Sequence, residues 1–123
     1  MASADGGGPV VQLFLMLIAG HAIADFWMQS DALAKMKNRH RATDPPPGQT
    51  PQAIWPYALT AHAIHHGAVV GYLTDSLQIG VAETAAHWLI DFGKCENWYG
   101  IHVDQVLHLL CKVGWCAVVV ASA

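Results

Sequence analysis

Histidine and carboxylate side chains recur one helical turn apart in several apolar segments of this chain. Residues 83–94 show the pattern most fully, because Glu83, His87 and Asp91 follow one another at i, i+4 and i+8 among alanine, tryptophan, leucine and isoleucine. Ionisable side chains on such an apolar helix are costly unless they pair with one another or bind a metal ion. The spacing therefore predicts a polar site inside a hydrophobic helical assembly.

Three other apolar segments each carry a pair of the same kind. Taken with the pair at His87 and Asp91, they provide eight candidate metal ligands: His21, Asp25, His62, His66, His87, Asp91, Asp104 and His108. Histidines and carboxylates that converge inside a helix bundle form dinuclear metal centres, and this mixture suits Zn, Mn or Fe. The alternative for any single pair is an interhelical hydrogen bond. The presence of four pairs favours one shared metal site.

Four further side chains lie close to this pattern. Glu83 lies about two turns deeper than Asp91 and is expected to be a proton relay or a support for a ligand. Lys112 either pairs with an acid such as Glu83 or extends outward. His65 lies one step off the stripe and is expected to pack. Gln29 either orients a ligand or caps its helix.

The segments that must position these residues are apolar enough to predict a membrane protein. The chain is 54% hydrophobic and 12% charged, whereas soluble domains have about 25% charged residues. Since a soluble helix needs a charged outer face, a soluble bundle is the less favoured alternative. We expect a single all-α domain over 10–121, a polytopic membrane four-helix bundle of up-down topology, after a disordered leader over 1–9. Its spans are predicted at about 10–29, 53–74, 77–93 and 101–120, of which the third is short for a full crossing.

The basic residues predict an orientation. Five of the six Lys and Arg residues fall in 30–51, an expected loop with a Pro-rich stretch, and in 93–100. Because cytoplasmic loops are enriched in Lys and Arg, both segments are expected in the cytoplasm and both termini outside, in the inner (plasma) membrane. The net charge of −3 argues against nucleic-acid binding. The expected partner is the lipid bilayer, and homo-oligomerisation is left open.

The motifs together resemble an uncharacterised family of small bacterial and phage integral membrane proteins, a domain of unknown function. They are His21-x-x-x-Asp25-Phe-x-x-Gln29, the His-rich helix from His62 to His66, His87-x-x-x-Asp91-x-x-Lys94, and Asp104-Gln105-x-x-His108. The similarity runs from about residue 13 to 112, and the Pro-rich loop at 44–51 is not part of it. The resemblance implies Lys94 and Gln105 as additional site residues and implies no activity.

The leading functional hypothesis is a membrane protein with a metal centre near the cytoplasmic face. As a hydrolase of a lipidic or interfacial substrate, it would use Asp25 or Asp91 as general base and Lys94 to polarise the leaving group. Whether the protein is an enzyme is left open. One alternative is a proton or metal-ion conducting protein, because intramembrane histidine and carboxylate chains serve as relays. Another is a structural phage membrane protein whose polar layer only fixes helix packing.

Overall fold

The structure is a computed structural model, and it describes residues 7–41, 45, 47–49 and 53–123. Residues 1–6 of the predicted leader lie outside this part, as do residues 44, 46, 50 and 51 of the predicted Pro-rich loop.

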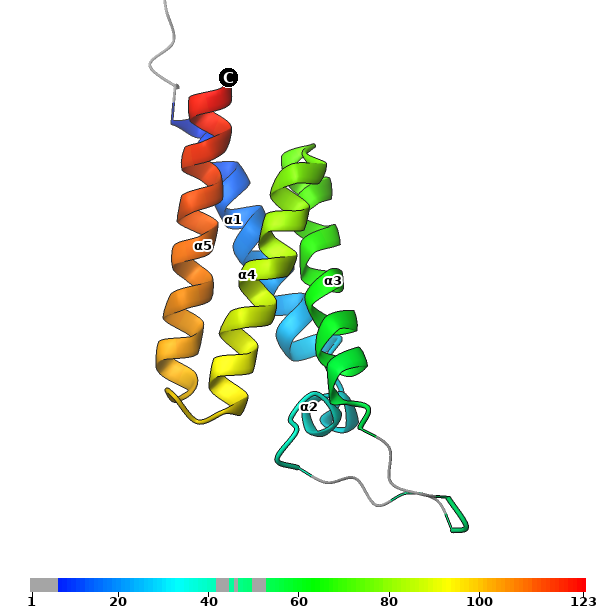
Figure 1. Ribbon diagram of the computed structural model, residues 1–123. Helices are drawn as coiled ribbons and strands as arrows, with labels where there is room; N and C mark the ends of the chain where they lie inside the picture. Colours follow the sequence, from blue (N-terminus) through cyan, green and yellow to red (C-terminus); the bar gives the residue numbers. More distant parts are fainter. Residues whose placement is uncertain (1–6, 42–44, 46, 50–52) are drawn as a thin grey trace, which may run out of the picture.

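Four long helices lie side by side and alternate in direction along the chain (Figure 1). They are α1 (Gly8–Ala22), which continues into the π-helical turn η1 (Ile23–Trp27), α3 (Trp55–Thr74), α4 (Leu77–Cys95) and α5 (Ile101–Ser122). Helices α1 and α4 each pack against both α3 and α5. The described residues contain no strand, so the prediction of an all-helical fold is confirmed.

Helices α3 and α4 form a close pair joined by a short turn. Asp75 ends α3 in the left-handed conformation (φ 49°), and the side chain of Ser76 caps α4 by accepting a hydrogen bond from the backbone N–H of Ile79. A Cβ built on Gly67 would lie 2.5 Å from the carbonyl oxygen of Gly80. Only glycine permits this approach, as expected for small residues at helix interfaces in membranes.

A short helix corrects the prediction of an uninterrupted loop over 30–51. Helix α2 (Asp31–Met36) begins at Ser30, whose side chain accepts a hydrogen bond from the backbone N–H of Leu33. A serine cap followed by an aspartate and helix-forming residues is the sequence signal that predicts this start. Helix α2 lies beside the end of the bundle that the loop between α4 and α5 also occupies (Figure 1).

The distribution of polar and apolar side chains is the reverse of that in a soluble bundle. Among the described residues, ten polar or charged side chains and eight hydrophobic ones are buried, whereas large hydrophobic residues such as Phe26, Ile64, Tyr72 and Leu89 are exposed. In a soluble helix the apolar stripe faces the core.

Two helical stretches, Gly8–Trp27 and Ile101–Ser122, are long and apolar enough to cross a membrane. Of the four predicted spans, the first and the fourth meet this criterion of length and apolar composition. Helix α4 carries three charged residues, Glu83, Asp91 and Lys94, and three histidines lower the hydropathy of α3.

Candidate metal centre

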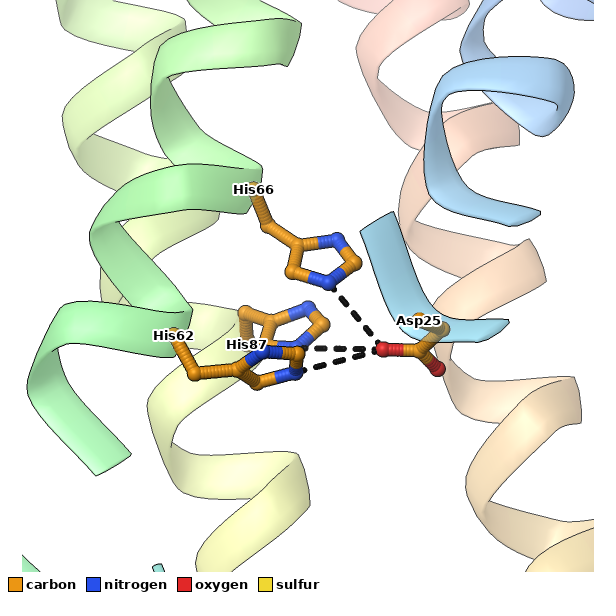
Figure 2. A group of neighbouring side chains, drawn as sticks. All are labelled: Asp25, His62, His66 and His87. Carbon is orange, nitrogen blue, oxygen red and sulfur yellow. Dashed lines mark ion pairs between the residues drawn. The ribbon is translucent and has the colours of Figure 1, made fainter. Parts of the chain in front are cut away.

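Three histidines and one aspartate from three helices turn their ligand atoms toward a common point (Figure 2). Asp25 Oδ1 lies 3.2 Å from His62 Nε2, 3.0 Å from His66 Nε2 and 4.0 Å from His87 Nε2. All four side chains are buried, yet none of these four atoms has a hydrogen-bond partner among the described residues. Buried polar atoms are normally satisfied, and unsatisfied atoms that converge in this way fit a bound cation.

Two further groups extend this arrangement into a continuous cluster. His87 also belongs to a group with His21 and His108, and His108 belongs to a third group with Asp91 and Asp104. His108 Nε2 lies 3.3 Å from Asp91 Oδ1 and 3.5 Å from Asp104 Oδ1. Within each group the ligand atoms lie within 4.8 Å of one another. The overlap at His87 and His108 gives the cluster room for more than one ion.

All eight ligands predicted from the sequence lie in these three groups. The i, i+4 spacing places each pair on one helical face, and the packing of α1, α3, α4 and α5 turns the four faces inward. His65, by contrast, is only partly buried and lies outside the three groups.

Asp25 lies in the π-helical turn η1, whereas the sequence predicted a regular α-helix at this position. A π-helical turn takes more residues than an α-helical one, and such turns occur frequently at functional sites. Ala24 and Asp25 are the buried residues of η1. Because η1 ends at Trp27, Gln29 lies beyond the helix and does not continue its polar stripe. It is not the C-cap of η1 either, because Met28 occupies that position.

Gln105, which the resemblance implied, joins two parts of the cluster. Its side-chain N–H group donates to Asp25 Oδ2 at 3.2 Å and to Asp104 Oδ2 at 3.0 Å. Its oxygen lies 3.4 Å from His21 Nε2. A fixed amide between two carboxylates orients both, as residues that support metal ligands commonly do.

Lys37 is a cluster residue that the sequence reasoning placed only in a cytoplasmic loop. It follows α2, is buried, and donates to Asp91 Oδ2 at 2.5 Å. Its position depends on the direction of α2, which brings the residues after this helix beside the end of α4. No spacing relation between Lys37 and Asp91 could have predicted this contact.

On the other side of the cluster, Glu83 and Lys112 form a buried ion pair. Trp115 Nε1 donates to Glu83 Oε2 at 2.5 Å, and His87 Nδ1 lies 3.6 Å from Glu83 Oε1. This resolves the two alternatives for Lys112 in favour of pairing. The adjoining part of the bundle is apolar, with a core of Leu17, Val70, Ile79 and Cys116. The polar chain therefore leads into a hydrophobic core.

The end of the bundle that carries α2 is fixed by contacts outside the long helices. Arg39 donates two hydrogen bonds to the carboxylate of Glu96, and this pairing lowers the pKa of Glu96. Tyr99 donates to the carbonyl oxygen of Ile90, and burial raises the pKa of its phenol. Lys94, a predicted catalytic residue, is partly exposed and lies 3.8 Å from Asp104 Oδ2.

The family model described as "Protein of unknown function (DUF3307)" matches residues 13–122. The chain belongs to this family. The match covers every residue of the three ligand groups and extends through α5. No curated protein and no solved structure matches the chain.

Proposed function

We propose that this family member is a multi-pass membrane protein that holds a transition-metal centre near the cytoplasmic face and uses it to hydrolyse an interfacial substrate. The observation that carries the proposal is the convergence of four buried ligand atoms, from Asp25, His62, His66 and His87, none of which has a hydrogen-bond partner among the described residues. Leaving several polar groups unpaired in an apolar bundle costs several kcal/mol, about 1–3 for each. A metal ion removes this cost.

The exposed apolar side chains favour the proposal that a lipid bilayer surrounds all four long helices. Helices α3 and α4 carry exposed Ile64, Tyr72, Val81 and Leu89 although they contain half of the buried polar residues that the structure describes. Their low hydropathy thus comes from side chains that face the interior. A lipid environment accommodates such an exterior and requires polar groups to be satisfied within the bundle.

The proposed orientation rests on the residues at the end of the bundle that carries α2. Four basic residues lie in or directly after α2, and Lys94 lies near the end of α4. Trp27, Tyr57 and Trp98 are exposed where η1 ends, where α3 begins and in the loop between α4 and α5. Amphipathic rings and basic residues of this kind mark a cytoplasmic membrane interface. Both termini then face away from the cytoplasm.

The residues of the cluster suit hydrolytic chemistry. A bound transition metal supplies a Lewis acid and an activated water. Asp25 and Asp91 are the candidate general bases, because each carboxylate lies among the ligand histidines. Lys94, which is partly exposed beside Asp104, would stabilise negative charge on a leaving group.

The apolar core favours a site over a conduction path. A proton or ion path needs polar groups at graded depths across the bundle. Here Glu83 and Lys112 are followed by Leu17, Val70 and Ile79, which are almost completely buried. A polar chain that ends at packed aliphatic side chains holds a charge but does not deliver it to the other face.

Metal analysis of the detergent-purified protein, before and after incubation with Zn, Mn and Fe, tests the proposal. We expect one or two ions per chain. The matched variants are His87→Ala and His65→Ala, because both histidines lie in the bundle helices but only His87 belongs to the ligand groups. The His87 variant should lose metal and thermal stability, since an ion that binds only the folded state stabilises it. Wild-type protein that takes up no metal, or equal effects of the two substitutions, would contradict the proposal.

A further inference from the structure

A cavity of about 290 Å³ opens at the end of the bundle that carries α2. Its walls come from α2 and the residues after it, from the end of α4 and from the loop between α4 and α5. Three of the lining residues are cations, Lys37, Arg41 and Lys94, and three carry amides, Gln29, Asn38 and Asn97. No lining residue among those the structure describes is acidic. The lining thus offers several hydrogen-bond donors, three of them on cationic side chains.

This cavity adjoins the metal-ligand cluster through two of its cations. Lys37 contacts Asp91 at 2.5 Å, and Lys94 lies 3.8 Å from Asp104. Both aspartates belong to the ligand group that contains His108. One layer of side chains therefore separates the cavity from the candidate centre.

The burial of two lining residues, Lys37 and Gln29, bears on what the cavity can bind. Lys37 lines the cavity, is only 4% exposed, and donates a hydrogen bond from its ammonium group to Asp91. Gln29 Oε1 is buried without a hydrogen-bond partner among the described residues.

We propose that the cavity binds a phosphate group, either on a membrane lipid or on a soluble compound, and presents it to the metal centre. The proposal deepens the hydrolase proposal above and rests on it for the reaction, but the cavity's affinity for phosphate rests on the protein's own cations. Lys and Arg are the residues that hold phosphate oxygens in proteins, Lys as a point charge and Arg through a bidentate contact. Exposed Trp27, Tyr57 and Trp98 lie at this end of the bundle, as rings at a membrane interface do, and lipid phosphates occupy such an interface.

Isothermal titration calorimetry of the full chain in a non-ionic detergent tests this inference. The probes are inorganic phosphate and short-chain phosphatidic acid, with the corresponding diacylglycerol, which lacks the phosphate, as the lipid control. The variants are Lys94→Gln and Arg41→Gln. Their matched control is Lys35→Gln, because Lys35 is exposed on α2 and does not line the cavity. Metal content and thermal unfolding are measured on the same samples.

We expect wild type and the Lys35 variant to bind a phosphate probe, and the Lys94 and Arg41 variants to bind it at least tenfold more weakly with unchanged metal content. Binding of phosphatidic acid alone would identify a lipid source, and binding of inorganic phosphate a soluble one. Equal binding by all four proteins, or no binding of either probe by metal-loaded wild type, overturns the inference. Neither result contradicts the proposal of a metal centre. Should the protein take up no metal, the hydrolase proposal fails, and the same comparison on metal-free protein still decides the cavity.

Discussion

Lys37 Nζ lies 2.5 Å from Asp91 Oδ2, and both side chains are almost completely buried. The lysine belongs to the segment after α2, and the aspartate lies near the end of α4 among the candidate ligands. Because a buried carboxylate needs a counter-charge, this contact attaches the α2 segment to the cluster. Arg39 and Glu96 form a second attachment nearby. The α2 segment is thus part of the site and not a passive connection.

Replacing Lys37 by methionine should destabilise the metal-free protein by about 3–5 kcal/mol, because Asp91 is left buried without its cation. Metal-loaded protein should lose less, since a bound ion supplies positive charge near the same carboxylate. Thermal unfolding followed by circular dichroism measures both effects. Lys35→Met is the control, and equal melting temperatures for the two variants would show that the pair contributes nothing.

Glu83 and Lys112 should behave as a coupled pair. Glu83→Gln leaves the Lys112 ammonium without its counter-ion, and Lys112→Met leaves the Glu83 carboxylate with Trp115 as its remaining donor. Each single change should cost about 3–5 kcal/mol. The double variant should cost clearly less than the sum, because neither charge is then left alone. Additive losses in a double-mutant cycle would contradict the pairing.

Gly67→Ala should destabilise the bundle by about 1–3 kcal/mol through overpacking. The added methyl group would lie 2.5 Å from the backbone oxygen of Gly80, which cannot move without shifting α4. Gly114→Ala is the matched control in α5, where a Cβ meets nothing within 4 Å. This control should gain up to about 1 kcal/mol from helix propensity. Unfolding temperatures in detergent that fall equally for both variants would refute a specific contact between α3 and α4.

The pairing of Arg39 with Glu96 should contribute to stability only above acidic pH. The pKa of Glu96 is lowered from its ordinary value of 4.5 by the hydrogen bonds from Arg39. A carboxyl whose folded-state pKa is depressed stabilises the fold above its unfolded pKa and loses this effect as the pH falls through the folded value. The melting temperatures of wild type and Arg39→Gln should therefore differ at pH 7 and converge below pH 4.5. A difference that persists unchanged at low pH would assign the effect to the contact of Arg39 with the Phe92 ring.

The proposed orientation predicts opposite labelling of two exposed positions. Cysteines introduced at Arg41 and at Ser122, in a background without the three free native cysteines, are treated with a membrane-impermeant maleimide in intact cells. Only the Ser122 position should react from outside, since the basic end of the bundle is expected in the cytoplasm. The Arg41 position should react after permeabilisation. Reaction of both positions from outside would contradict the four-span arrangement.

The local patterns in the sequence were enough to predict the four long helices and the eight candidate ligands. Pairs such as His62 and His66 lie one turn apart, so the geometry of a single helix already places them on one face. The apolar residues around them predicted helices with a hydrophobic exterior. These properties depend on residues close in sequence, which is why they could be inferred without a structure.

Only the tertiary structure decided which faces meet and what closes the site. Lys37 contacts Asp91 across 54 positions of the chain, and Gln105 contacts Asp25 across 80. Such contacts depend on the direction of α2 and on the packing of α1 against α5. The spacing of residues in the sequence predicts neither. The π-helical turn at Asp25 likewise changes the local geometry that regular spacing predicts. Sequence spacing therefore determined the face of each ligand pair. Helix packing determined the partners of Lys37, Lys112 and Gln105, because these contacts join residues that are far apart in the sequence.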